Sequence, residues 1–136
     1  MTRWLLDTSV AIPALVENHP AHASCVSATA GRDVVMATHS ALETYSVLTR
    51  LPGDARLVPG DAARLLGARF GSPIPLPLDR AIGLVDELAR LGIAAGATYD
   101  ALIGLTAASD GRVLLTRDRR AAATYSRLGV AHTFVA

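Results

Sequence analysis

The chain has 136 residues, of which 51% are hydrophobic and 18% charged, with a formal net charge of +1. This length suits a single domain over residues 1–136, and the apolar content excludes a disordered chain. The balanced charge gives no sign of nucleic-acid binding through charge alone, and the lone cysteine, Cys25, excludes an internal disulfide and a cysteine-based zinc cluster. No stretch approaches the roughly 18 consecutive apolar residues of a membrane span, so we expect a cytoplasmic protein with no membrane contact.

The first half of the chain alternates short apolar runs with helical patterns. The expected elements are a strand over residues 3–7, helices over 10–17 and 20–30, a strand over 33–38 and a helix over 40–51. Asp7 therefore stands at the C-terminal end of a buried strand, directly before a helix.

The second half continues the alternation after a proline-rich segment. Residues 72–78 carry three prolines at alternate positions, which limits any strand there to a short edge strand because proline donates no ladder hydrogen bond. The other expected elements are helices near 60–69 and over 79–91, 98–109 and 119–128, and strands over 113–115 and 132–135. The amphipathic pattern of the 79–91 helix predicts four inward-facing residues, Ile82, Val85, Leu88 and Ala89.

Strands that alternate with helices predict an α/β fold, a three-layer α/β/α sandwich with a central parallel sheet. In the usual doubly wound topology, the first strand lies beside the 113–115 strand. Ligands bind beyond the C-terminal ends of the strands at such a switch point. Asp7 and Asp118 would then face each other across this crevice.

Four acidic residues stand where they would point at that crevice. Asp7 and Asp118 follow apolar strands, whereas Glu43 and Asp100 lie near the starts of helices, where an anion is favoured. Crowded carboxylates repel one another and do not all stay ionised without a partner. The chain has no lysine, so the natural partner is a hard divalent cation, Mg²⁺ or Mn²⁺. Carboxylate-held metals are suited to phosphodiester hydrolysis.

Each acid also has an ordinary structural explanation. Asp7 is equally well explained as the N-cap of the following helix. Glu43 would by default be a surface acid, and Asp100 and Asp118 would stabilise the first turns of helices. The joint pattern is stronger than any single acid, because hydroxyl residues stand beside the acids: Thr8, Ser9 and Thr116.

Four short motifs occur in order along the chain: Leu6–Ser9, Ala41–Leu48, Tyr99–Ile103 and Leu115–Asp118. In these motifs and their separations the chain resembles the PIN-domain ribonucleases and, within them, the VapC toxins of bacterial toxin–antitoxin pairs, over nearly its whole length. The resemblance implies a parallel sheet with four acids that bind Mg²⁺ or Mn²⁺. It also implies endonuclease cleavage of RNA, with tRNA and rRNA as candidate substrates, leaving 5′-phosphate and 3′-hydroxyl ends.

Carried over residue by residue, the resemblance makes Asp7 and Asp100 the main metal ligands, completed by Glu43 and Asp118 directly or through water. Ser9 and Thr116 would orient the carboxylates. Arg117 and Arg119 border the acids, and an RNA phosphate contact and a solvated helix face explain them about equally well. Arg119 and Arg120 stand where some relatives carry a further acid, so one metal and two metals both stay open.

The resemblance also implies partners. A VapB-type antitoxin would wrap the toxin, and apolar faces of three helices are available to receive it, over residues 10–17, 20–30 and 60–69. A homodimer is expected, which would bind promoter DNA only through the antitoxin.

The main alternative is a non-catalytic interaction module with the same fold. Four intact acids argue against it, because a binding module gains nothing from their repulsion. His39, near Glu43, could touch substrate, but a loop or cap role is the default expectation. Tyr99, beside Asp100, could stack on a base, but a packed aromatic is the default expectation.

Overall fold

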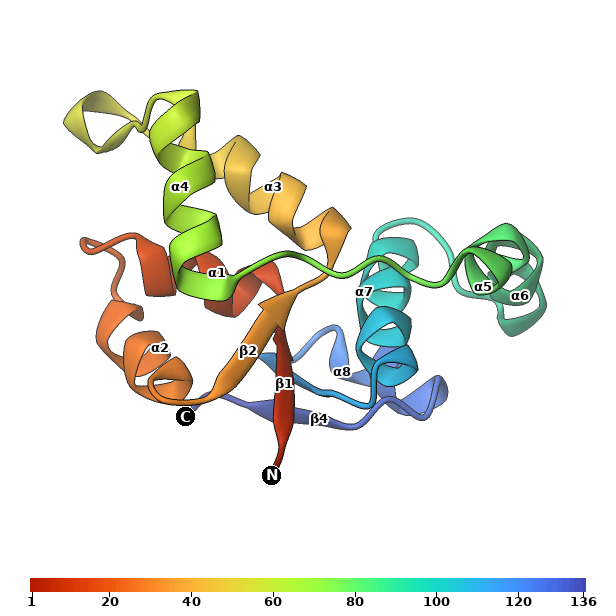
Figure 1. Ribbon diagram of the computed structural model, residues 1–136. Helices are drawn as coiled ribbons and strands as arrows, with labels where there is room; N and C mark the ends of the chain where they lie inside the picture. Colours follow the sequence, from red (N-terminus) through yellow and green to blue (C-terminus); the bar gives the residue numbers. More distant parts are fainter.

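A four-stranded, wholly parallel sheet lies at the centre of the structure, a computed structural model that describes residues 1–136 (Figure 1). Its strand order is β2-β1-β3-β4. The strands are β1 (Arg3–Leu6), β2 (Asp33–Met36), β3 (Val113–Thr116) and β4 (His132–Phe134). In the register, Leu5 of β1 pairs with Val35 on one side and with Leu114 on the other. The predicted neighbourhood of the first strand and the 113–115 strand is therefore confirmed.

Successive residues of β1 face opposite sides of the sheet, and each side has its own apolar core. Leu5 packs in a cluster with residues of α7 (Ala97–Ser109) and α8 (Ala122–Arg127), among them Leu105 and Tyr125. Leu6 packs in a second cluster with residues of α1 (Thr8–Leu15), α2 (His22–Thr29) and α4 (Pro59–Phe70), among them Val10 and Phe70. The sheet thus lies between two helical layers, as the three-layer prediction required.

Two further segments complete the body of the molecule. The helix α3 (Thr38–Leu48) follows β2 and is joined to α4 through the short 3-10 helix η1 (Gly53–Ala55). The proline-rich segment forms no edge strand; it makes a single parallel bridge, between Ile74 and Ala37. The alternating prolines explain this, because they remove the donors that a longer ladder needs.

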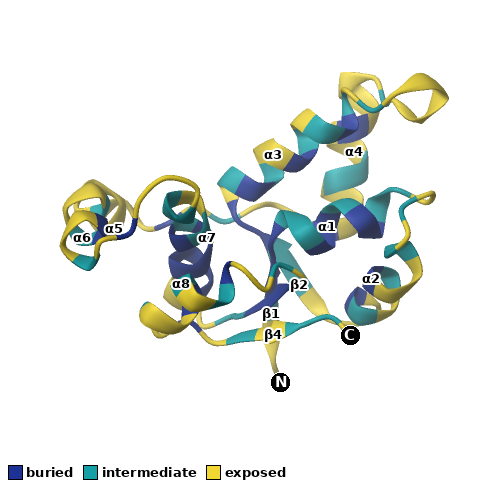
Figure 2. Cartoon of the chain, turned by 180° about the vertical axis from the view of Figure 1, so that it is seen from behind, coloured by how far each residue is buried: buried dark blue, intermediate teal, exposed yellow.

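The predicted 79–91 helix is two helices. α5 (Leu78–Ile82) and α6 (Leu84–Leu91) meet at Gly83, the residue type least suited to a helix interior after proline. These helices stand away from the sheet, and most of their surface is exposed (Figure 2). Leu88 is buried as predicted, but the inward orientation predicted for Ile82, Val85 and Ala89 is wrong: Ile82 is 76% exposed and Val85 79%.

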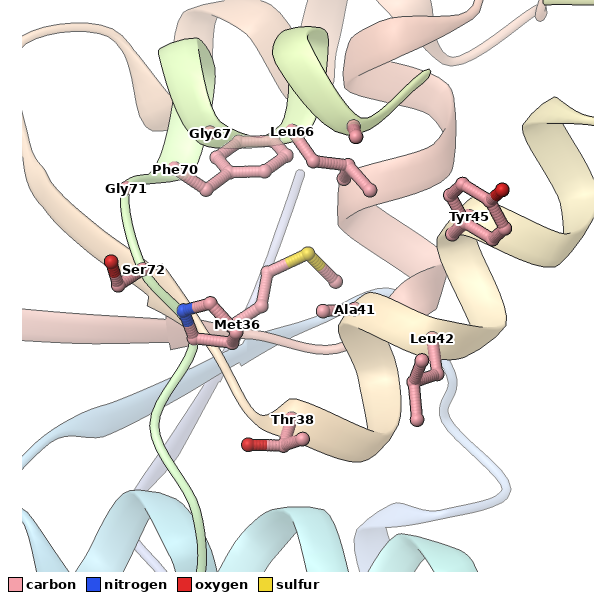
Figure 3. A pocket seen from close by; sticks show the side chains of 12 residues that line it. Met36, Thr38, Ala41, Leu42, Tyr45, Leu66, Gly67, Phe70, Gly71 and Ser72 are labelled. Atoms are coloured by element: carbon pink, nitrogen blue, oxygen red, sulfur yellow. The ribbon is translucent and has the colours of Figure 1, made fainter. Parts of the chain in front are cut away.

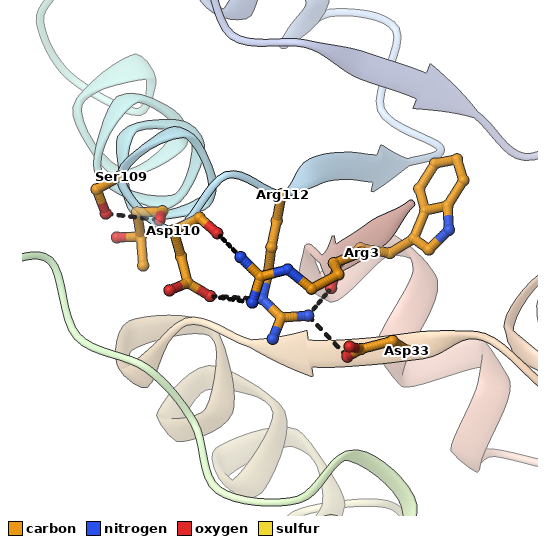
Figure 4. Close-up of polar contacts among 7 residues, drawn as sticks. Arg3, Asp33, Ser109, Asp110 and Arg112 are labelled. Atoms are coloured by element: carbon orange, nitrogen blue, oxygen red, sulfur yellow. Dashed lines mark hydrogen bonds and ion pairs between the residues drawn. The ribbon is translucent and has the colours of Figure 1, made fainter. Parts of the chain in front are cut away.

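The opposite end of the sheet from Asp7 is tied together by Arg112 (Figure 4). Its guanidinium donates to Asp110 at 2.7 Å, to Asp33 at 2.9 Å and to the backbone carbonyl of Trp4 at 3.2 Å. One side chain thus links the starts of β1 and β2 to the turn before β3. No helix of the structure has the length and apolar character needed to cross a membrane.

Candidate active site

Asp7 lies at the point where β1 ends and α1 begins. It is the N-cap of α1, and its Oδ1 accepts hydrogen bonds from the Ser9 backbone N–H at 3.0 Å and from Ser9 Oγ at 2.5 Å. Its Oδ2 accepts from Thr116 Oγ1 at 2.5 Å and from the Tyr125 hydroxyl at 3.4 Å. Asp7 is therefore both a helix cap and a buried carboxylate between neighbouring parallel strands. The N-cap explanation is confirmed, and the role of Asp7 as a metal ligand stays a prediction.

The two hydroxyl residues beside Asp7 also connect the ends of β1 and β3. Ser9 Oγ accepts a hydrogen bond from the Arg117 backbone N–H at 2.8 Å, and Thr116 Oγ1 accepts one from the Asp118 backbone N–H at 3.0 Å. Each hydroxyl thus accepts from the chain that follows β3 and donates to Asp7. The orientation of the Asp7 carboxylate is consequently coupled to the backbone that carries Asp118.

Asp100 stands in the first turn of α7, and its electrostatics place the other acids near it. Burial raises its pKa, and the negative charges of Asp118, Asp7 and Glu43 raise it further, whereas Arg120 opposes them. Burial is also the largest influence that raises the pKa of Asp7; hydrogen bonds from Ser9 and Thr116 oppose it, and the charge of Asp118 adds to it. Asp100 therefore experiences the negative charge of all three other predicted acids, which come from separate segments of the chain.

The remaining acid, Glu43, projects from α3 beside His39. The two side chains form an i,i+4 pair, with His39 Nε2 3.2 Å from Glu43 Oε1. Glu43 also lines a small cavity of about 190 Å³ with residues of α1 and α3, including Thr8 and Arg50. With 46% of its side chain exposed, against 35% for Asp118, Glu43 is the most open of the four acids to solvent.

The donor set suits a hard cation. Carboxylate oxygens are the ligands that Mg²⁺ and Mn²⁺ prefer, and an added cation would offset both burial and mutual repulsion at Asp7 and Asp100. The chain has no group of three or more His, Cys, Asp or Glu side chains already spaced to hold a metal. The residues thus fit a divalent cation by their chemistry, and their side chains would have to draw together around it.

The arginines after β3 differ in where they lie. Arg117 donates to the Ser9 carbonyl at 3.2 Å, and the Arg119 guanidinium lies 4.4 Å from the centre of the Phe134 ring. Both predicted RNA contacts are thus engaged within the chain. Arg120, the third arginine after β3, is almost fully exposed, and its Nε lies 3.8 Å from Asp118 Oδ1.

Tyr125 is a site residue that sequence reasoning missed. It is fully buried in α8, with its hydroxyl at Asp7. Burial raises its pKa above 10.0, and the charges of Asp7 and Asp100 raise it further, so the hydroxyl stays protonated and donates. Tyr99, expected to be a packed aromatic, packs on one side only: its ring stacks on His39, and the residue is 53% exposed.

Two apolar grooves lie away from the four acids. One, of about 440 Å³, runs between α3 and α4 and is lined by apolar residues that include Met36, Leu66 and Phe70 (Figure 3). The other, of about 730 Å³, is bounded by α1, α2 and α4 and by the segment that follows α3. The three helices α1, α2 and α4, which bound this second groove, correspond to the helices over 10–17, 20–30 and 60–69 that we expect to receive the antitoxin.

Comparison with known proteins agrees with this geometry. Residues 4–126 match the family model of the PIN domain. The chain is 51% identical over 131 residues to Ribonuclease VapC27 of Mycobacterium tuberculosis. The alignment covers 96% of this chain and 95% of that relative.

Solved structures show the same fold. FitAcB from Neisseria gonorrhoeae aligns with a TM-score of 0.72 at 19% identity, covering 95% of both chains. VapBC2 from Rickettsia felis, bound to a DNA fragment from its promoter, aligns with a TM-score of 0.68 at 12% identity, covering 98% of both chains. From the family match and the identity to VapC27, the chain belongs to the PIN-domain family and, within it, to the VapC ribonucleases.

Proposed function

We propose that the chain is the endoribonuclease toxin of a type II toxin–antitoxin pair, and that it cleaves structured RNA, tRNA or rRNA, with the help of Mg²⁺ or Mn²⁺. The proposal is supported by the buried position of Asp7 at the end of β1 and by the charges of Asp118, Asp7 and Glu43, all of which act on Asp100. Burial and mutual repulsion raise the pKa of Asp7 and Asp100. A fold gains no stability from such crowding, and a metal-dependent nuclease needs it.

In this proposal Asp7 and Asp100 hold the metal, and Glu43 and Asp118 complete the site. A bound divalent cation would supply an activated water and charge stabilisation at the phosphate. Ser9 and Thr116 keep the Asp7 carboxylate oriented through hydroxyls that are themselves held by the backbone after β3. Arg120, exposed beside Asp118, is better placed than Arg117 or Arg119 to meet a phosphate.

The direct test is cleavage of total RNA by the purified chain in Mg²⁺, Mn²⁺ or EDTA. Loss of outer partners of a metal site costs about 10- to 100-fold in activity, so removal of a ligand should cost at least about 100-fold. Asp7→Asn and Asp100→Asn should therefore abolish the discrete fragments, as should EDTA.

Asp86→Asn is the matched control, because Asp86 is an exposed acid of α6. Equal cleavage by the wild type and both active-site variants would refute the site. No cleavage in any metal by a folded wild type would instead favour the non-catalytic interaction module.

The second part of the proposal is a VapB-type antitoxin partner, through which alone the pair would contact promoter DNA. It is supported by the 730 Å³ groove, whose walls come from the three predicted helices, and by the toxin–antitoxin relatives that share the fold. An amphipathic segment would lay its apolar face in this groove.

Leu65→Glu, inside the groove, should disrupt co-purification with the co-expressed antitoxin. Leu42→Glu, on the separate α3–α4 groove, is the control. The reverse result would show that the antitoxin uses the other groove.

A homodimer is the third part of the proposal. Helices α5 and α6, which stand away from the sheet, carry three large apolar residues with most of their surface exposed: Leu78, Ile82 and Val85. A second copy of the chain would remove them from water. Light scattering should find a dimer that Val85→Glu converts to a monomer; an unchanged mass would show that the dimer, if formed, uses another face.

A further inference from the structure

The rings of His39 and Tyr99 form a stacked pair at the rim of the acidic region. Their centroids lie 5.0 Å apart, and their planes are within 3° of parallel. His39 belongs to the first turn of α3 and Tyr99 to the first turn of α7. The pair therefore spans the gap between the two helices that carry Glu43 and Asp100.

Both rings are fixed relative to the acids. His39 Nε2 lies 3.2 Å from Glu43 Oε1, so this contact restrains the imidazole plane. The Tyr99 ring stacks on this imidazole, and Tyr99 stands next to Asp100 in the first turn of α7. A molecule on the outer face of the Tyr99 ring would thus be separated from Glu43 by the two stacked rings alone.

The outer side of the Tyr99 ring is free. Tyr99 is 53% exposed, although His39 covers one of its faces. The exposed surface therefore comes from the opposite face and the ring edges. An aromatic ring that is already flat, backed and open on one face is the kind of surface on which proteins stack unpaired bases of RNA.

We propose that Tyr99, backed by His39, is a stacking platform for one unpaired base next to the cleaved bond. This inference rests on the proposed ribonuclease function and narrows its substrate class to RNA in which the cleaved bond lies in an unpaired segment. A base inside a duplex is stacked on its neighbours and has no free face to offer, so a fully paired RNA would not use the platform.

Binding can be tested apart from cleavage. In the Asp7→Asn background, fluorescence anisotropy would follow a short, labelled, unstructured RNA of mixed sequence. Loss of a stacking ring weakens binding by about 5- to 150-fold, so Tyr99→Leu should raise the Kd by that factor, whereas Tyr99→Phe should keep it near its original value. The same RNA as a duplex should show no difference between the variants.

Tyr45→Leu is the matched control, because Tyr45 is a partly buried tyrosine of α3 that lines the 440 Å³ groove between α3 and α4. Thermal melting of each variant shows whether the fold is intact. Equal binding of unpaired RNA by Tyr99→Leu and its parent would overturn the platform, whatever the chain does to RNA. Failure of the wild type to cleave, with the expected binding difference present, would instead overturn the nuclease proposal alone.

A second measurement identifies the base. An RNA hairpin that carries the mapped cleavage site in its loop would be made with one abasic nucleotide at each position near the cut. At one position, the missing base should raise the KM of the wild type and add nothing to the effect of Tyr99→Leu, with kcat little changed. Additive effects at every position would show that Tyr99 does not act by stacking.

Discussion

Asp7 is the residue on which the local structure converges. Its two carboxylate oxygens accept four hydrogen bonds, from the backbone and side chain of Ser9, from Thr116 and from Tyr125. These donors belong to α1, β3 and α8, so the carboxylate is held from both sides of the sheet's end. Burial nevertheless outweighs them and raises its pKa.

The raised pKa of Asp7 gives a prediction for stability against pH. The folded chain binds this proton more tightly than the unfolded chain, so the associated stability is fully present below the ordinary pKa of 3.8 and is lost as the pH rises through the raised value. Asp7→Asn cannot ionise, so it does not lose stability in this way as the pH rises. In EDTA the variant should therefore be more stable than the wild type near neutral pH, and the difference should shrink towards about pH 4.

Urea unfolding of both proteins at several pH values would measure this difference. A wild type that is more stable than Asp7→Asn at neutral pH without divalent cations would contradict it. Added Mg²⁺ should stabilise the wild type and not the variant, since only the wild type retains the full set of carboxylates.

Tyr125→Phe tests the positioning of Asp7 through a single atom. The phenyl ring would keep the packing in α8, and the carboxylate would lose its longest hydrogen bond, of 3.4 Å. We expect cleavage to fall by a few-fold to about 10-fold, at the low end for partners of this kind, because that bond is long. The optimum pH should move upward, since one donor that favours the charged carboxylate is gone. An unchanged rate and pH profile would show that the contact is packing only.

Helix α7 shows how one small residue makes room for a site residue. A Cβ added at Gly104 would lie 3.0 Å from Tyr125 Cδ1 and 3.3 Å from Val130 Cγ2. Tyr125 is fully buried against this helix and has little freedom to move. Glycine is therefore required here by close packing, in spite of its low helix propensity.

Two glycine-to-alanine changes in helix interiors should have opposite signs. Gly104→Ala should destabilise the chain by about 1–3 kcal/mol through overpacking and should also lower activity, because it displaces Tyr125. Gly67→Ala, in α4, meets no atom within 4 Å and should stabilise by up to about 1 kcal/mol. Urea midpoints of the two variants give the comparison. A stabilised Gly104→Ala would mean that the Tyr125 ring yields at little cost.

The two ends of the sheet carry different sets of charged residues. The acids gather where the central strands finish, whereas Arg112 ties the strand starts together with its side chain only 8% exposed. The two ends differ in whether their buried charges are paired. Arg112 is matched by Asp33 and Asp110, while the four carboxylates at the other end have no such buried cation (Figure 4).

Arg112→Met should therefore lower stability without changing the chemistry. We expect a loss of roughly 1–3 kcal/mol, moderated because Asp33 and Asp110 are partly open to water. The activity per folded molecule should stay at the wild-type level. Arg64→Met, which breaks an exposed pair with Asp61, should stay within about 0.5 kcal/mol. A stable Arg112→Met protein with reduced cleavage would show that the two ends are coupled.

The sequence by itself predicted the parallel α/β fold, the order of its elements and the four acids, because these follow from local information. Apolar runs of four residues, glycine and proline boundaries, and an acid directly after a strand are all visible in the linear chain. That the site is a metal centre made by these acids stays a prediction, as does the single domain over residues 1–136.

Tertiary structure alone decided which side chains meet and which stay exposed. Tyr125 has the sequence signature of an ordinary core aromatic, and only the packing of α8 against the sheet brings its hydroxyl to Asp7. Ile82 and Val85 have the periodicity of a buried face, but they stay exposed because α5 and α6 stand away from the sheet (Figure 2). His39 and Tyr99 are 60 positions apart in sequence, and only the fold stacks them. Periodicity reports that a face is apolar, whereas burial depends on a surface that other parts of the chain must supply.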